Sequence, residues 1–341
     1  MPSKKTWSWK GPGLVLALVL VLGLAACTGA LPQSTLHPIS DFGRRIDDLF
    51  RRIFWFAVGV FVVVEGLLVY AVFRFRDRGG EGRPEPVHGS TRLEIAWTLA
   101  PAVILVLIAV PTIRTIFVVD NPPPAADNAL PIDVIGHQWW WEFRYPTLGI
   151  VTADEMHVPV GRTVELHLTS KDVIHSFWVP RIGGKRDVVP GHDNFLWFAV
   201  DSAGEYPGQC AEFCGEEHAL MRVLAIAQDS ATFQAWADSQ KPDGREPTDS
   251  MAIQGRQLVT NGICISCHTI RGTQAQGTIG PDLTHVGSRQ TLVATVLPNT
   301  PENMFRWIHN PDSVKPGTKM KIPQLPDDQI RKIVAYLQSL K

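Results

Sequence analysis

Cysteine is scarce in this sequence, which has five cysteines among 341 residues, and four of the five lie in two short clusters. A lysine- or arginine-rich tail is also missing, and the formal net charge is −1. Without a basic surface to neutralise phosphates, the composition gives no indication of a nucleic-acid partner, and we expect none. No internal repeat is visible, and the length suits two or three different modules.

The first apolar run, GLVLALVLVLGLAAC, follows three lysines and ends at Cys27, an arrangement typical of a signal peptide. Its last four residues, Leu24 to Cys27, resemble the cleavage box of bacterial lipoproteins. We therefore expect residues 1–26 to be a lipoprotein-type signal peptide and Cys27 to be acylated after cleavage. The alternative is an uncleaved anchor in which Cys27 has no role.

Two further apolar runs, Ile53 to Phe73 and about Ile95 to Val119, each reach the roughly 20 residues needed to cross a bilayer. They predict a transmembrane helical hairpin over residues 40–120, with helices at about 53–73 and 95–119. Glu65 lies midway along the first helix, where we expect its carboxyl group either to face another protein or to be protonated.

The sequence after the hairpin divides into two parts. Stretches such as IDVIGHQWWWEFRY, TVELHLTS and NFLWFAV are β-branched and aromatic, and they predict an antiparallel β-sandwich or barrel over residues 125–228. Residues 229–250 are polar and contain proline, as is typical of a linker. Residues 251–341 predict an all-α domain that ends in an amphipathic helix, with Ile330, Ile333, Val334 and Leu337 on one face.

The first cysteine cluster is Cys-x3-Cys-x3-His-x2-Met, formed by Cys210, Cys214, His218 and Met221. Soft sulfur ligands select copper, zinc or iron–sulfur, and the added thioether on a β-sandwich favours copper. Two thiolates are too many for a mononuclear blue-copper site, but they could bridge two coppers and spread one electron over both.

A bridged copper pair needs a second imidazole from elsewhere, and His175, in SKDVIHSFWVP at the end of a predicted strand, is the best candidate. A disulfide between the two cysteines is an alternative in an oxidising compartment. Zinc is another alternative, although methionine is a poor zinc ligand.

The second cluster, CISCH, places Cys264 and Cys267 to add to the two vinyl groups of haem and His268 to bind its iron. A thioredoxin-like redox pair is the alternative. We expect Met320, in the Pro/Gly-rich stretch PGTKMKIP, to be the sixth iron ligand rather than Met304 or Met251. His285 and His309 are expected to be packing or surface residues.

Arginines flank both sides of the first predicted membrane helix, so the positive-inside rule does not fix the orientation. Haem is attached to CxxCH sites in an exported compartment, and a lipoprotein signal would place residue 27 outside the cell membrane. Two spans bring the chain out again. We therefore expect a multi-pass protein of the bacterial inner membrane, with residues beyond 120 on the periplasmic or outer face.

Several segments taken together resemble subunit II of the haem–copper cytochrome c oxidases. They are LEIAWTLAP at 93–101, GHQWWWEF at 136–143, VIHSFWVP with VVPGH, and the CAEFCGEEHALM loop, so the resemblance covers about residues 40–226. It implies a cupredoxin-like domain with a dinuclear copper A centre. Residues 251–341, including GPDLTHVGSR at 280–289 with Pro281 near the haem-binding histidine, resemble a class I cytochrome c.

The resemblance implies roles for further residues. The copper ligands would be His175, Cys210, Cys214, His218 and Met221. The backbone carbonyl of Glu212 would join them, and its side chain would reach a magnesium ion at the boundary with subunit I. Trp139 matches the residue through which electrons enter the copper site, Glu94 the mouth of a proton channel, and Asp172 a docking residue for cytochrome c. At least one of the three tryptophans 139–141 is expected only to pack.

The resemblance implies an electron-transfer subunit of a proton-translocating cytochrome c oxidase. Electrons would pass from haem c to copper A and on to haem a of subunit I, where dioxygen is reduced to water. Subunit III is a further expected partner, and cytochrome c or a quinol–cytochrome c reductase the expected donor. The alternative is a membrane-anchored haem c and copper carrier for another terminal enzyme, such as a nitric oxide reductase. A quinol oxidase subunit II is excluded, because that relative lacks the copper ligands.

Overall fold

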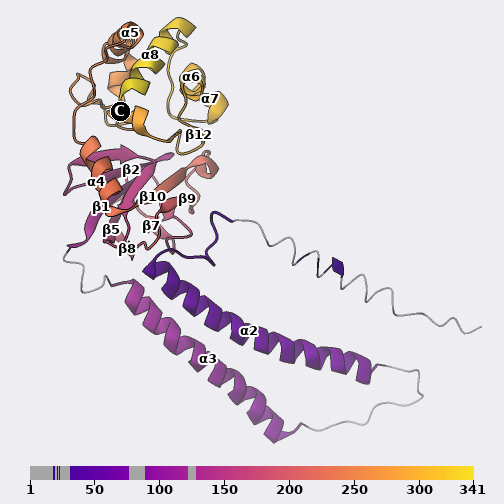
Figure 1. Ribbon diagram of the computed structural model, residues 1–341. Helices are drawn as coiled ribbons and strands as arrows, with labels where there is room; N and C mark the ends of the chain where they lie inside the picture. Colours follow the sequence, from indigo (N-terminus) through magenta and orange to yellow (C-terminus); the bar gives the residue numbers. More distant parts are fainter. Residues whose placement is uncertain (1–17, 20, 22, 24–30, 77–88, 122–127) are drawn as a thin grey trace, which may run out of the picture.

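The computed structural model describes residues 18, 19, 21, 23, 31–76, 89–121 and 128–341. Along this part of the chain a helical hairpin is followed by a β-sandwich and then by a small helical domain, and the three are stacked in that order in space (Figure 1). The predicted multidomain fold class is therefore confirmed. Cys27 and most of the predicted signal peptide lie outside the described residues.

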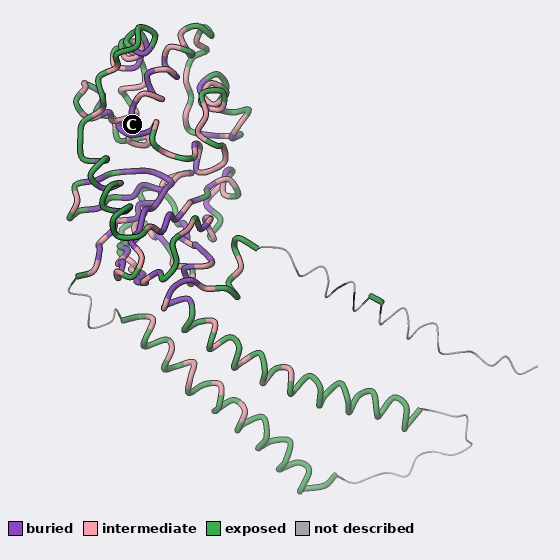
Figure 2. The backbone as a smooth tube through the Cα atoms, viewed as in Figure 1, coloured by how far each residue is buried: buried purple, intermediate pink, exposed green. Residues whose placement is uncertain are grey.

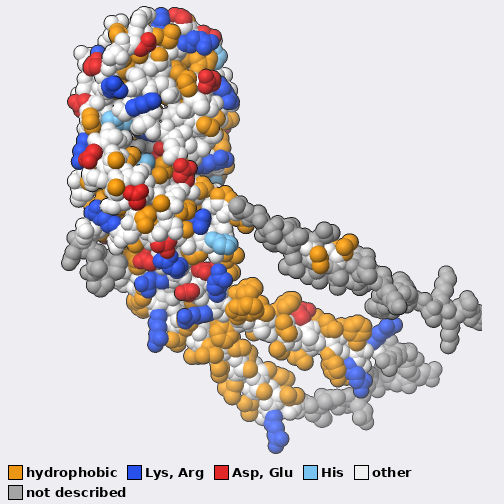
Figure 3. Space-filling view, in the orientation of Figure 1, with side chains coloured by type: hydrophobic (Ala, Val, Ile, Leu, Met, Phe, Trp, Pro, Cys, Tyr) orange, Lys and Arg blue, Asp and Glu red, His pale blue; other side chains and the backbone are white. Residues whose placement is uncertain are grey.

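The hairpin consists of α2 (Asp41–Arg74) and α3 (Thr91–Val119), which contain the two predicted spans. Both are long and apolar enough to cross a membrane. Most of their residues are exposed (Figure 2), and hydrophobic side chains cover much of the hairpin, whereas charged side chains are scattered among other groups over the globular part (Figure 3). This surface requires lipid or another membrane protein around it.

The first turn of α2 belongs to the base of the sandwich rather than to the membrane. Ser40 caps the helix by accepting a hydrogen bond from the Gly43 N–H at 2.9 Å, and the Asp41 carboxylate accepts one from Ala199 N–H at 2.8 Å. The Phe42 ring is buried with its centroid 5.7 Å from that of Trp197, in an edge-to-face arrangement. Helix α2 therefore starts well before its apolar run and joins the sandwich directly.

The sandwich has two five-stranded sheets, in the orders β3-β2-β1-β5-β8 and β4-β10-β9-β6-β7. The strands are β1 (Leu130–His137), β2 (Trp140–Tyr145), β3 (Ile150–Ala153), β4 (Glu155–Pro159), β5 (Thr163–Ser170), β6 (His175–Trp178), β7 (Arg186–Val188), β8 (Asn194–Ala199), β9 (Gly204–Cys210) and β10 (Arg222–Gln228). The predicted sandwich is confirmed, but β1 pairs with β5 and β4 with β10 in parallel. Each sheet is therefore mixed rather than purely antiparallel.

The predicted linker, 229–250, begins as a helix, α4 (Ser230–Ser239). Asp229 caps it by accepting hydrogen bonds from the N–H groups of Ala231 and Thr232. Phe233 is buried, and the Trp236 ring stacks on His157 of the sandwich with centroids 4.1 Å apart. This packing adds a helix that composition alone did not indicate, and the extended connection shortens to about residues 240–249.

The C-terminal domain has its own hydrophobic core, separate from that of the sandwich. Its elements are α5 (Ser250–Thr260), η3 (Ile263–Ser266), η4 (Val286–Ser288), β11 (Thr291–Leu292), β12 (Leu297–Pro298), α6 (Pro301–His309), α7 (Pro311–Val314) and α8 (Asp327–Ser339). The predicted apolar face of α8 is buried. A Cβ atom at Gly255 of α5 would overlap the carbonyl oxygen of Lys332, so the two helices pack backbone to backbone there.

Gly255→Ala is expected to lower the melting temperature of the C-terminal domain by about 10 °C, because overpacking costs roughly 1–3 kcal/mol in a domain of this size. Calorimetry of the full-length chain in detergent measures this transition. Gln257→Ala, at an exposed position of the same helix, is the control and should melt like the wild type. A Gly255→Ala variant as stable as the wild type would contradict the close α5–α8 contact.

Candidate metal centre

The ligands predicted for copper lie at one end of the second sheet. Cys210 is the last residue of β9, and His175 is the first residue of the neighbouring strand β6. The loop from β9 to β10 carries Cys214, then the short helix η2 (His218–Leu220), and it returns at Met221 just before β10. The Cys210 N–H donates to the Met221 carbonyl at 2.9 Å, which closes the loop at its base.

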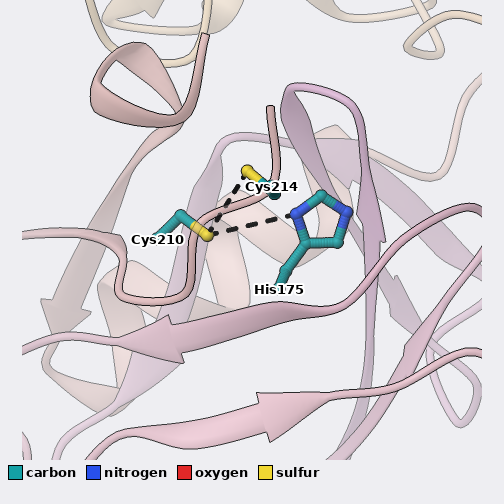
Figure 4. Close-up of side chains that lie close together, drawn as sticks. All are labelled: His175, Cys210 and Cys214. Atoms are coloured by element: carbon teal, nitrogen blue, oxygen red, sulfur yellow. Dashed lines mark hydrogen bonds between the residues drawn. The ribbon is translucent and has the colours of Figure 1, made fainter. Parts of the chain in front are cut away.

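Within this loop the ligand atoms lie close to one another. The two sulfurs of Cys210 and Cys214 are 3.8 Å apart, and the His175 Nδ1 lies 4.0 Å from the Cys210 Sγ (Figure 4). On the other side, the Cys214 Sγ is 3.6 Å from the His218 Nδ1 and 3.8 Å from the Met221 Sδ. The Glu212 carbonyl oxygen lies 3.2 Å from the Cys210 Sγ.

This donor set fits a pair of copper ions bridged by two thiolates. The sulfurs are too far apart for a disulfide bond, whose S–S length is about 2.05 Å. Each sulfur has an imidazole on its outer side, and the thioether and the carbonyl oxygen supply one weak ligand at each end. Soft and imidazole donors of this kind match copper better than zinc. The geometry therefore favours the copper interpretation over both alternatives.

Outer contacts hold the His175 ring in place. Its Nε2 lies 2.9 Å from the Asp172 Oδ1, which leaves Nδ1 toward the sulfurs. Burial raises the pKa of Asp172, but hydrogen bonds from His175 and from the Gln138 N–H outweigh burial and lower that pKa to about 2. A Cβ atom at Gly136 would lie 2.7 Å from the imidazole Cδ2, so only glycine leaves room for the ring. Asp172 therefore orients a copper ligand.

The three tryptophans have different surroundings. The Trp139 Nε1 donates to the Cys214 carbonyl at 3.0 Å, which places this ring against the ligand loop. Trp140 stacks on His137 with centroids 4.2 Å apart. Trp141 is fully buried and packs edge-to-face on Phe177, as expected of a core residue. Of the three, Trp139 is the one in contact with the metal-binding loop.

The two glutamates expected at the boundary with subunit I are exposed. Glu212 and the neighbouring Phe213, which is 77% exposed, point outward from the ligand loop. Glu94 lies in the first turn of α3, at the end of the hairpin far from the sandwich (Figure 1). Among the described residues, the group of candidate metal ligands is His175, Cys210 and Cys214, and it does not include the Glu212 side chain.

The second cluster lines a cavity of about 780 Å³ in the C-terminal domain. Cys264, Cys267 and His268 face it, and both cysteines are free. The His268 Nδ1 lies 2.8 Å from the Pro281 carbonyl oxygen, so Nε2 is available to a metal. A Cβ atom at Gly280 would lie 2.6 Å from the imidazole Cε1. Volume, thiols and imidazole together fit a covalently attached haem.

Both Met320 and Met304 line this cavity. Met304 is buried in α6, where its sulfur accepts a hydrogen bond from the Gln338 amide at 3.8 Å, whereas Met320 lies in the loop before α8. His285 bonds to the Pro242 carbonyl, and His309 lies 3.6 Å from the Asp327 carboxylate. The two histidines have the packing and surface positions that were expected.

Residues of the sandwich also line the haem cavity, among them His137, Trp139, Trp140 and Asp172. No sequence pattern indicates the contacts that join the two domains. Asp154, Glu155 and Lys315 are buried between them, although their sequence surroundings look like ordinary polar turns. Their partners in the other domain lie 95 or more residues away along the chain, so no local pattern could identify them.

Comparison with known families agrees with this architecture. Residues 39–115 match the cytochrome c oxidase subunit II transmembrane domain, 148–228 the periplasmic domain of the same subunit, and 252–341 cytochrome c. The matches follow the three structural units in order, and among the described residues from 31 onward they leave out 31–38, 116–121, 128–147 and 229–251, which include β1, β2 and Trp139.

Two relatives are similar to this chain over almost its whole length. The chain is 38% identical to cytochrome c oxidase subunit 2 of Alkalihalophilus pseudofirmus, covering 98% of each chain, and 35% identical to that of Bacillus subtilis, covering 96% of this chain and 97% of the relative. The crystal structure of the periplasmic domain of subunit II from Bradyrhizobium japonicum is 33% identical, with a TM-score of 0.33, and covers 35% of this chain and 96% of that one. The chain belongs to the cytochrome c oxidase subunit II family, as a membrane subunit with a fused cytochrome c domain that transfers electrons through copper A.

Proposed function

We propose that this chain is the electron-input subunit of the oxidase and that its two clusters hold one haem c and one copper pair. The ligands would be His175, Cys210, Cys214, His218, Met221 and the Glu212 carbonyl for copper, and Cys264, Cys267, His268 and Met320 for haem. The observation that carries the proposal is the position of Trp139, which both contacts the copper loop and lines the haem cavity. When bound, the haem and the copper pair supply the electron carriers, in the order haem c, copper A, haem a of subunit I.

The protein side chains act by holding these groups still. The sulfurs of Cys210 and Cys214 face each other, 3.8 Å apart, from the end of β9 and the loop that follows it. Asp172 fixes the His175 ring, and the Trp139 indole fixes the Cys214 backbone. Small structural change on oxidation favours rapid electron transfer, which is what an input subunit requires.

We also propose contacts with the rest of the enzyme. The exposed Glu212 and Phe213 lie where the sandwich would meet subunit I, with the Glu212 carboxylate on a magnesium ion shared by the two chains. Glu94, at the opposite end of α3, would stand at the cytoplasmic mouth of a proton channel in subunit I. Subunit III is a further partner. The donor is cytochrome c or a quinol–cytochrome c reductase, and Cys27 carries a lipid in the bacterial inner membrane.

Replacing one bridging thiolate should destroy the copper pair and spare the haem. In Cys214→Ser the hard hydroxyl cannot bridge two soft metals, so we expect the bound copper to fall and the mixed-valence paramagnetic signal to disappear. Metal analysis and electron paramagnetic resonance of the purified complex measure both. Ala219→Ser, in the same loop but not facing the ligands, should keep both coppers. Full copper binding in Cys214→Ser would exclude the bridged pair.

The choice between the two methionines is tested by redox titration. Met320→Ala should leave the haem attached through its cysteines but lower its midpoint potential, because thioether ligation raises the potential of haem iron. Met304→Leu replaces a buried thioether with a side chain of similar volume, so the potential should stay near that of the wild type. The opposite pattern would make Met304 the iron ligand.

A further inference from the structure

Two buried carboxylates of the sandwich bind backbone N–H groups of the haem domain. Glu155 accepts hydrogen bonds from the N–H groups of Gln290 and Thr291, at 3.2 and 2.7 Å, and from the Thr291 hydroxyl at 2.6 Å. The next residue back, Asp154, accepts one from the Ala294 N–H at 3.1 Å. Glu155 is only 2% exposed. These bonds form the first contact region between the domains.

The haem-domain turn in this region has an unusual shape. Val293, Ala294 and Thr295 all have positive φ, at 59°, 53° and 60°, which non-glycine residues rarely adopt. The Ala294 N–H, at the centre of the turn, is the group that donates to Asp154. A turn of this shape persists only where its surroundings hold it in place. The hydrogen bond from Ala294 to the Asp154 carboxylate of the other domain supplies such support, which indicates a specific contact between the domains.

The second contact region is formed by Lys315, in the loop that leads from α7 to Met320. Lys315 is 4% exposed, and its ammonium group donates to the carbonyl oxygens of Trp139 at 2.7 Å and of Leu220 at 3.0 Å. Trp139 touches the copper loop, and Leu220 directly precedes Met221. The Lys315 side chain therefore joins the haem domain both to the turn that contains Trp139 and to the loop that contains the predicted copper ligands.

Lys319, from the same loop, adds exposed contacts around this point. Its Nζ donates to the Gln138 side-chain oxygen at 2.7 Å, lies 3.7 Å from the Asp172 carboxylate and is 5.9 Å from the Trp139 ring centroid. Trp139 is left only 9% exposed. The haem domain therefore covers Trp139, the residue expected to receive electrons. Lys319 of the same domain also pairs with Asp172, the residue expected to dock an external cytochrome c.

A buried ammonium group is costly unless charges and acceptors surround it. The pKa of Lys315 is lowered to about 8, because burial outweighs the opposing effect of the Asp154 and Glu217 carboxylates. Arg222 is the cation that faces it. An apolar side chain could fill this space without that cost. A charged side chain makes the contact specific, because its ammonium group fits only where two carbonyl groups converge to accept its hydrogen bonds.

We propose that Lys315 is a positioning residue that, with Asp154 and Glu155, fixes the haem domain on the copper domain at Trp139. The inference rests on the proposed function, in which haem c supplies electrons to copper A through this face. In the resulting arrangement an external donor delivers its electron to the haem domain, because Trp139 is not accessible.

The test is Lys315→Met in the full-length oxidase complex loaded with haem and copper. The variant leaves two buried carbonyl groups without a donor, so we expect the domain interface to open about 10- to 100-fold more often. Hydrogen exchange of residues 288–296, which include the amides bound by Asp154 and Glu155, measures the opening directly. Electron transfer from haem to copper after rapid reduction of the haem should slow by at least about tenfold.

Lys241→Met is the control. Lys241 lies in the connecting segment, away from the residues that line the haem cavity, and its exposed side chain pairs with Asp238, so its exchange and transfer rates should equal those of the wild type. Glu155→Gln tests the interface from the copper side, at a distance from the loop of Met320. It keeps the acceptor but loses the charge, and we expect a smaller increase in exchange over residues 288–296.

The haem and copper spectra of the wild type test the proposed function separately. A chain that bound neither haem nor copper would lack these spectra, and this result would contradict the proposed function without affecting the exchange experiment. With intact spectra, unchanged exchange over residues 288–296 in both Lys315→Met and Glu155→Gln would overturn the proposal. Slower electron transfer with unchanged exchange would also overturn it, because Lys315 would then act on Trp139 alone and not on the position of the domain.

Discussion

The arrangement of the metal centre depends on one hydrogen-bond acceptor, the carbonyl oxygen of Cys214. It accepts hydrogen bonds from the Trp139 indole at 3.0 Å and from the Gln138 side-chain amide at 2.7 Å. Those donors lie in the turn between β1 and β2 of the first sheet, whereas Cys214 lies in the loop that ends the second sheet. The two sheets are thereby joined at their metal-binding end, and the turn that faces the haem cavity is fixed to the copper ligands.

The copper ligands are also part of the main core. Cys210, Cys214 and Met221 are buried in the same cluster as the aromatic side chains of both sheets. Close-packed surroundings resist movement, and they keep water away from the sulfurs. The haem domain has a separate core, and the contacts between the two domains include the hydrogen bonds of Glu155 and Lys315. This division is consistent with a soluble cytochrome fold joined to an existing copper domain.

The sequence predicts those parts of the site that are local. Cys210, Cys214, His218 and Met221 share one loop, and the CISCH segment is one turn, so their spacing alone indicates the chemistry. His175 could be proposed because it ends a predicted strand, and the structure brings it next to Cys210. The overall composition of residues 229–250 conceals helix α4, although Asp229 is a favourable N-cap and Phe233, Trp236 and Ala237 have helical spacing. Nor could Lys315 be distinguished from Lys319 or Lys321, because the difference is burial against a distant domain.

A fused donor could act through proximity alone, because a short flexible linker already gives an effective concentration in the millimolar range. The segment that connects the two domains of this chain is held in place by hydrogen bonds, however. The Arg271 guanidinium donates to the carbonyl oxygens of Gln240, Lys241 and Pro242, at 2.5, 3.2 and 3.0 Å, and so holds the connecting segment against the haem domain. A tether supplies concentration but no orientation. The bound connection and the polar interface therefore supply an orientation of the haem cavity relative to Trp139 that fusion alone does not.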